Sequence, residues 1–175
     1  MGLFSKLFRK KEEKEKIPEE EPFHFDSPYC RFYYMSNPNT NEFGYEGEFK
    51  RSEDDIDELT IYLDTDAPES LEANICYTRL QDILSGREDI NEEVKRSMTD
   101  YFLSRTELTD DSCAEQEILN GFLLTWLGIF RNGEVKLSFD ASGIYASDIT
   151  VMLKADGTKE IQYTDDDYEE HCDKL

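Results

Sequence analysis

The chain has 175 residues and carries 41 Asp and Glu against 19 Lys and Arg, a length that fits one domain and excludes two large ones. The charge is divided unevenly, because residues 1–16 have six basic and three acidic side chains whereas residues 17–175 have 13 and 38. The acidic body repels phosphate groups, so direct nucleic-acid binding is not expected, and its charge favours a basic protein as partner.

Neither a membrane span nor a secretory signal is indicated by the sequence. No run approaches the ~18 apolar residues of a membrane span, and charged side chains begin at Lys6 instead of following a signal-peptide core. The four cysteines lie far apart and form no CxxC pair, which indicates reduced, partly buried thiols and not a zinc or disulfide framework. They are Cys30, Cys76, Cys113 and Cys172. We therefore expect a cytoplasmic protein that at most associates with the inner face of the membrane.

Residues 1–22 differ in composition from the rest of the chain and are predicted to be a disordered basic amphipathic head with a charged linker, in which Pro18 and Pro22 oppose helix formation. If the head forms a helix, its apolar side chains share one face and basic side chains flank that face. Such segments bind anionic membranes weakly, so the head is either a peripheral membrane contact or a frayed terminus. The candidate membrane-contacting residues are Leu3, Phe4, Leu7, Phe8, Lys10 and Lys11.

Residues 23–49 are rich in aromatic side chains and are interrupted by the turn-forming sequence SNPNTN, which predicts a β-hairpin. Apolar and polar residues alternate over 43–49 and again over 59–64, so two neighbouring strands are expected with Tyr45 and Ile61 on the core side. The acidic loop between these strands is the candidate contact for a basic partner. Its candidate partner-binding residues are Glu53, Asp54, Asp55, Asp57 and Glu58.

Three helices are predicted next, each from a capping signature followed by an apolar stripe. The first follows Asp66 and runs to about residue 84, and the second follows Asp89 and runs to about residue 102. The third follows Ser112, and its apolar face from 118 to 126 is the broadest of the three. That breadth predicts a central buried helix, in which Leu123→Ala would cost about 2–5 kcal/mol if the site is fully buried.

The last third of the chain predicts an antiparallel β-meander. Asn132-Gly133 and Asp156-Gly157 are strong two-residue hairpin turns, and each is flanked by alternating apolar residues. Residues 165–175 are polar and are expected to form a frayed acidic tail. The sequence thus predicts one α+β domain over residues 23–164, with an aromatic N-terminal β-hairpin and strand, three helices and a C-terminal antiparallel β-meander.

Catalytic signatures are not found. The two histidines, His24 and His171, lie where order is doubtful, and the chain has no GxSxG elbow and no glycine loop for phosphate. The acidic segments lack the glycine of a calcium loop. Glu134, Asp140 and Asp148 are candidates to approach one another, but a chain with 41 acids offers such groups by chance. We therefore assign no catalytic residue, no metal ligand and no cofactor.

From Phe43 to Tyr163, the order of hairpin, strand, helices and strand pairs resembles the bacterial domain of unknown function numbered 2262. The best-matching stretch runs from Leu127 to Gly157, where the sequences 149–151 and Asp156-Gly157 resemble an I-x-V and D-G hairpin of that family. Ser147-Asp148 stands where the family has a Gly-His pair. The resemblance implies an α+β fold in a bacterial cytosolic protein and supplies no activity.

These observations together predict a non-catalytic protein-binding domain whose acidic surface binds a basic protein partner. Inhibition of a basic toxin, as by an immunity protein or an antitoxin, is one version of this prediction. Two alternatives stay open: a membrane-recruited adaptor that uses residues 1–11, and an enzyme with a carboxylate-bound metal.

Overall fold

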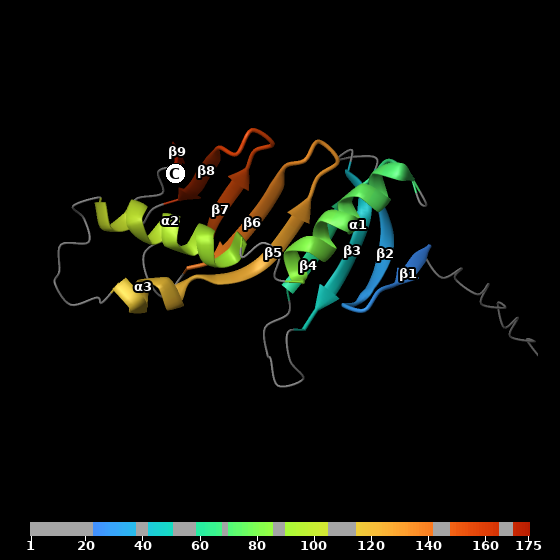
Figure 1. The fold of residues 1–175 in the computed structure, drawn as a ribbon, viewed down its shortest axis with the longest axis horizontal. Helices are drawn as coiled ribbons and strands as arrows, with labels where there is room; N and C mark the ends of the chain where they lie inside the picture. Colours follow the sequence, from blue (N-terminus) through green and yellow to red (C-terminus); the bar gives the residue numbers. More distant parts are fainter. Residues whose placement is uncertain are drawn as a thin grey trace, which may run out of the picture.

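The structure is a computed structural model, and it describes residues 23–37, 42–50, 59–67, 70–85, 90–104, 115–141, 148–164 and 170–175. Within these residues nine strands form a single sheet and three helices lie between the fourth and fifth strands in the chain (Figure 1). The strands are β1 His24–Asp26, β2 Arg31–Asn37, β3 Glu42–Phe49, β4 Leu59–Asp64, β5 Leu123–Ile129, β6 Val135–Asp140, β7 Asp148–Leu153, β8 Lys159–Thr164 and β9 Glu170–Lys174. The helices are α1 Leu71–Leu84, α2 Ile90–Ser104 and α3 Glu115–Gly121.

The sheet keeps the order of the chain from β1 to β9. Every neighbouring pair is antiparallel except β4 and β5, which are parallel and are joined by the crossover that contains the helices. A parallel pair needs such a long connection, whereas antiparallel strands need only short turns. The predicted α+β class is confirmed, with the N-terminal hairpin, three helices and C-terminal antiparallel strands in the predicted order.

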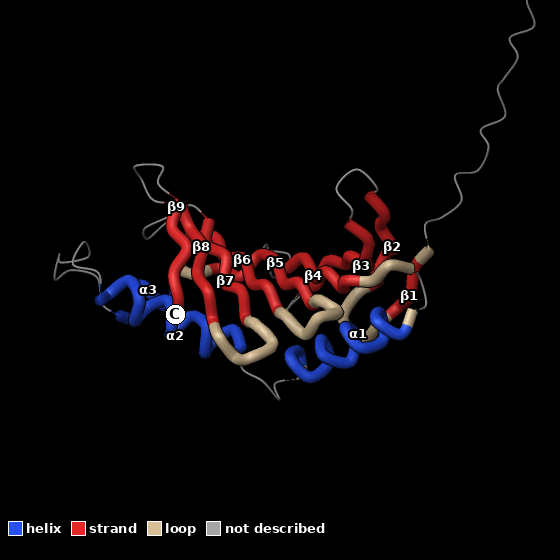
Figure 2. The backbone as a smooth tube through the Cα atoms, turned by 90° about the horizontal axis from the view of Figure 1, so that it is seen from above, coloured by secondary structure: helices blue, strands red, loops and turns tan. Residues whose placement is uncertain are grey.

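The three helices pack on one face of the sheet, which we call the helix face, and no described element covers the opposite, open face (Figure 2). Burial alternates along β4 and β6 because side chains on a strand point to opposite faces in turn. The buried members, such as Ile61, Leu63 and Leu137, form one hydrophobic core with Leu80 and Met98 of the helices. The outward members of the same strands are therefore available for function.

The two predicted hairpin turns are present. Gly133 and Gly157 have φ angles of 87° and 86°, a region that glycine enters without steric cost. In each turn the preceding side chain accepts a backbone hydrogen bond: Asn132 Oδ1 from Glu134 N at 3.0 Å and Asp156 Oδ1 from Thr158 N at 2.9 Å. The turns fix the register of β5 with β6 and of β7 with β8.

The start of α1 differs from the prediction. Ser70, not Asp66, is the N-cap, and its Oγ accepts a hydrogen bond from Ala73 N at 3.1 Å. The carboxylate of Asp66 instead forms an ion pair with Arg131. The start of α2 at Ile90 agrees with the predicted second helix, although its expected cap, Asp89, lies outside the described residues.

The predicted long third helix is wrong. The helix α3 ends at Gly121, and the sequence that was expected to complete its apolar face forms strand β5. Leu123 is 38% exposed, and Trp126 lies on the open face. A short apolar run has no clear helical or strand period, so its sequence alone does not distinguish a helix from a strand. In the structure, the backbone of this segment is hydrogen-bonded to β4 on one side and to β6 on the other, which makes it a strand. The expected high cost of Leu123→Ala therefore does not hold.

The end of the chain also differs from the expected frayed tail. Residues 170–174 form β9, which pairs antiparallel with β8, and Leu175 N donates to Lys159 O at 3.0 Å. The strand is tied to the helix layer, because Tyr101 of α2 donates its hydroxyl hydrogen to the carboxylate of Asp173. The sheet thus extends beyond residue 164, where the sequence placed the end of the domain.

Candidate functional site on the open face of the sheet

A shallow hollow of about 400 Å³ lies on the open face over β2 and β3. Tyr33 and Met35 point outward from β2 and are 41% and 44% exposed. Glu46 and Glu48 point outward from β3, and the register places Glu46 opposite Tyr33. We call this the acidic hollow. Its described lining residues are Arg31, Tyr33, Met35, Glu46, Gly47 and Glu48.

The two carboxylates of the acidic hollow are not neutralised by the basic residue beside them. Arg31 is held by Asp26, with Nε to Oδ1 at 2.6 Å and Nη2 to Oδ2 at 3.3 Å, and this contact raises the pKa of Arg31 and lowers that of Asp26. Within the described ranges, no ion pair involves Glu46 or Glu48. Two adjacent carboxylates therefore remain available to a cation from outside the chain.

The acidic loop of residues 51–58 connects to the same end of β3 as the acidic hollow. Its ends are fixed by the pairing of Phe49 with Leu59, one residue beyond Glu48. The predicted partner-binding residues themselves lie outside the described residues, as do all the predicted membrane-contacting residues of the head. The described strands thus place both attachment points of the acidic loop beside Glu48.

An aromatic cluster borders the acidic hollow on the side of β4 and β5. The rings of Tyr62 and Trp126 are stacked at 5.9 Å with an interplanar angle of 20°. Each ring lies against a glycine: a Cβ atom at Gly44 would come within 2.5 Å of the Tyr62 ring, and one at Gly128 within 2.2 Å of the Trp126 ring. The Tyr62 hydroxyl donates to the Phe43 carbonyl at 2.9 Å. The rings are therefore fixed, and they provide a rigid wall beside Glu46, which pairs with Tyr62 across β3 and β4.

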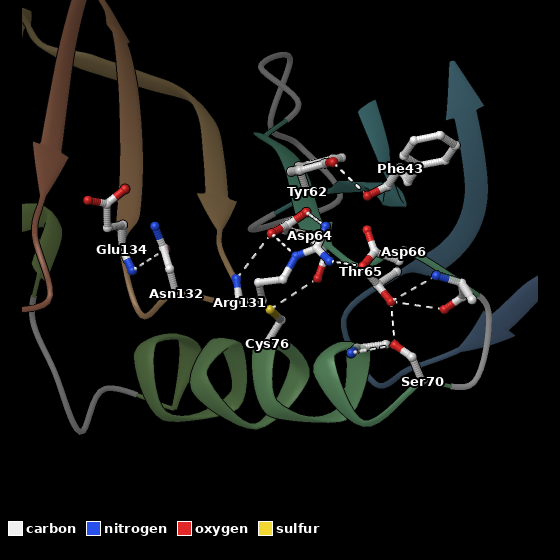
Figure 3. A network of polar contacts seen from close by, with 12 residues as sticks. Phe43, Tyr62, Asp64, Thr65, Asp66, Ser70, Cys76, Arg131, Asn132 and Glu134 are labelled. Carbon is white, nitrogen blue, oxygen red and sulfur yellow. Dashed lines mark hydrogen bonds and ion pairs between the residues drawn. The ribbon is translucent and has the colours of Figure 1, made fainter. Parts of the chain in front are cut away.

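A second polar group of residues joins the C-terminal ends of β4 and β5 (Figure 3). Arg131 donates to both carboxylate oxygens of Asp64, from Nε at 2.8 Å and from Nη2 at 3.0 Å, and it also pairs with Asp66. Cys76 of α1 donates its thiol hydrogen to the Asp64 carbonyl at 3.4 Å. Hydrogen bonds with Arg131 lower the pKa of Asp66, and those with both aspartates raise the pKa of Arg131. These charges satisfy one another, which favours a structural role over acid–base chemistry.

The residues that the sequence offered for catalysis are brought together only in part. His24 and His171 lie on β1 and β9, the two edge strands of the sheet. Asp140 and Asp148 are opposite each other in β6 and β7, but Glu134 lies at the other end of β6, where its carboxylate is 3.4 Å from Lys154 Nζ. In the described segments, no group of three or more His, Cys, Asp or Glu is placed to hold a metal ion.

Two of the cysteines are poor nucleophiles because of their surroundings. Burial, followed by the charge of Glu48, raises the pKa of Cys30 to about 11, and burial likewise raises that of Cys76 to about 11. Cys172 is exposed on β9. Cys30, Cys76 and Cys172 are free thiols, and Cys113 lies outside the described residues.

We expect iodoacetamide at pH 8 to modify Cys172 before Cys30 and Cys76, because only about one in a thousand thiols with a pKa near 11 is ionised at that pH. The rates at Cys30 and Cys76 should then rise about tenfold per pH unit up to pH 10. Peptide mapping by mass spectrometry measures each site separately. Modification of Cys76 as fast as Cys172 in the folded protein would contradict this assignment.

The sequence reasoning missed the acidic hollow and the aromatic cluster, although part of the signal was present. The alternation over 43–49 already placed Glu46 and Glu48 on the face opposite Tyr45. What it did not provide was the neighbour on each side, namely exposed Tyr33 and the fixed ring of Tyr62. Charge density alone favours the more acidic loop, residues 51–58, as the candidate contact.

Among the described helices, none combines the length and the apolar character that crossing a membrane requires. The resemblance to domain of unknown function 2262 stays a prediction. No protein-family model, no curated protein and no solved structure matches this chain.

Proposed function

We propose that this protein is a non-catalytic binding domain and that its acidic hollow receives a basic segment of a protein partner. The observation that carries the proposal is the pair of unneutralised carboxylates, Glu46 and Glu48, next to exposed Tyr33 and Met35. A Lys or Arg side chain fits such a surface, because its methylene groups pack on apolar atoms while its charged end reaches a carboxylate. Exposed tyrosine is also a frequent anchor of protein interfaces.

The charge of the whole body supports the same proposal. A balance of 13 basic to 38 acidic residues over 17–175 attracts a basic partner over distances comparable with the Debye length and raises the association rate. The acidic loop 51–58 would extend the attractive surface, since it leaves β3 next to Glu48. Inhibition of a basic toxin is one version of this function.

The rings of Tyr62 and Trp126 beside the acidic hollow are already fixed in the free protein, so they would lose little conformational entropy when a partner binds.

A comparison of two charge variants tests the proposal. Immobilised wild-type protein should retain basic proteins from a bacterial lysate at about 50 mM salt and release them at about 500 mM, where the Debye length is about threefold shorter. For a retained protein, the double change Glu46→Gln and Glu48→Gln should weaken binding by about tenfold or more. The matched control, Glu72→Gln with Asp100→Asn on the helix side, removes the same charge.

Two outcomes would count against the proposal. If no basic protein is retained at low salt, the acidic body has no partner of the proposed kind. If the control variant weakens binding as much as the change at Glu46 and Glu48, the attraction comes from net charge alone and the acidic hollow is not the site.

A further inference from the structure

A second hollow, of about 410 Å³, lies at the edge of the sheet between β1 and α1. Its walls are largely aromatic: the Phe25 ring is 4.9 Å from that of Tyr45 and 5.4 Å from that of Tyr77. Phe23, which is 48% exposed, lies at the same hollow. We call it the β1–α1 pocket. Its lining also includes Ala73 and Asn74 of α1 and the charged residue Asp26.

We propose that the β1–α1 pocket binds the N-terminal head of the same chain, residues 1–11, through the apolar side chains of Leu3, Phe4, Leu7 and Phe8. The proposal goes beyond the binding of a basic partner, because it concerns a different surface and an intramolecular ligand. It rests on three properties: where the chain enters the fold, the chemistry of the pocket and the charge of the two parts.

The chain enters the described fold at the pocket itself. Phe23 lines the pocket, and its carbonyl accepts a hydrogen bond from Tyr34 N at 2.7 Å, so the point of entry is fixed. A random coil as long as the stretch that separates Phe8 from Phe23 has a root-mean-square span of roughly 20 Å and a maximum near 50 Å. The head therefore reaches the pocket without strain, and its effective concentration there is on the order of millimolar.

The chemistry of the pocket fits the apolar face of the head better than the acidic hollow does. The pocket offers several aromatic side chains on which Phe4 and Phe8 can pack edge to face, whereas the described lining of the acidic hollow has only one aromatic ring and Met35 beside two carboxylates and an ion-paired arginine. The charges are complementary as well, since residues 1–16 have three more basic than acidic side chains and the rest of the chain is strongly acidic.

Docking of the head in the β1–α1 pocket would bury its four apolar side chains. The same side chains would then not be available for contact with a membrane or another partner. A membrane surface would then have to compete with a tethered site on the chain's own domain. The head would become available only when the pocket is blocked or when a competing surface is concentrated.

Fluorescence of an indole placed in the head by Phe4→Trp tests the proposal in the full-length chain. The contribution of the native Trp126 is measured on the unsubstituted chain and subtracted. The exposed reference is the synthetic peptide of residues 1–16 carrying the same change. We expect acrylamide to quench the new indole at least threefold less in the full chain than in the peptide, with emission shifted to shorter wavelength.

A blocking variant and a matched control locate the site. Asn74→Arg puts a bulky cation at the pocket wall from an exposed position, so it should restore quenching to the level of the peptide without affecting folding. Gln81→Arg adds the same charge to an exposed position two turns along α1, outside the described pocket lining, and should leave the protection unchanged.

The proposal is overturned if the new indole is quenched as strongly in the full chain as in the peptide. It is also overturned if protection persists in Asn74→Arg, since the head then packs elsewhere. Protection that increases with protein concentration would overturn the intramolecular contact in favour of a head supplied by a second copy of the chain.

Discussion

Leu127→Ala is expected to lower the free energy of unfolding by about 2–5 kcal/mol, because it leaves a cavity at the centre of the sheet. Leu127 is 2% exposed and lies between Ile61 of β4 and Leu137 of β6, both of which are also buried. The position joins the only parallel pair of strands in the described sheet, so neighbouring side chains have little freedom to move into the cavity. Urea denaturation followed by circular dichroism gives the change directly.

The matched control is Leu123→Ala in the same strand. Leu123 is 38% exposed, so the same deletion of atoms removes less buried surface and should cost under about 1 kcal/mol. Equal losses for the two variants would show that Leu123 is as buried as Leu127, and would restore the helical interpretation of this segment.

Asp64→Asn is expected to cost about 1.5–3 kcal/mol, because charge-assisted hydrogen bonds in a half-buried site are among the stronger ones. The Asp64 side chain is 16% exposed and accepts from Arg131 Nε, Nη2 and the backbone N–H, the last at 3.3 Å. An amide cannot accept at both positions, so one donor of Arg131 would lose its partner. Thermal unfolding of wild type and variant at pH 7 measures the loss.

Asp66→Asn provides the comparison for the same arginine. Asp66 is 73% exposed, so removal of its charge should cost less than the change at Asp64.

Arg131 holds the pKa of Asp66 below its ordinary value of 3.8. The stabilisation is therefore complete above that value and disappears as the pH falls through the lower, folded-state pKa. The difference between wild type and Asp66→Asn should be constant from pH 5 to 7 and should close in acid. A difference that grows in acid would contradict the assigned ion pair.

The elements with a strong local signal were predictable from the sequence, and those decided by distant pairing were not. The turns at Gly133 and Gly157 and the alternation in β4 follow from neighbouring residues alone. Strand β5 has the sequence LLTWLGI, which is almost entirely apolar and fits a buried helix equally well until β4 and β6 are known to flank it. In the same way, β9 is polar by composition, and its order comes from pairing with β8.

In the candidate site, too, some features follow from neighbouring residues and others depend on residues that are distant in the sequence. The outward direction of Glu46 and Glu48 follows from the period of a strand, but their lack of an ion-pair partner in the described structure depends on Arg31 being held by Asp26. Asp64 and Arg131 are 67 residues apart in the sequence, and nothing local to either predicts their contact. The glycines at 44 and 128 could be recognised as strand residues, but not as the positions against which Tyr62 and Trp126 pack.

The parallel junction of β4 and β5 has a consequence for the order of folding. On either side of it the strands pair with their neighbours in the sequence, so the hairpins of β1–β4 and of β5–β9 close short loops and have low contact order. Only the junction requires the entropy of closing the long crossover that contains all three helices. We expect each antiparallel ladder to nucleate by itself and the parallel pairing to form in the rate-limiting step. Substitutions at Ile61 or Leu127 would then slow folding, whereas those in the outer strands would mainly speed unfolding.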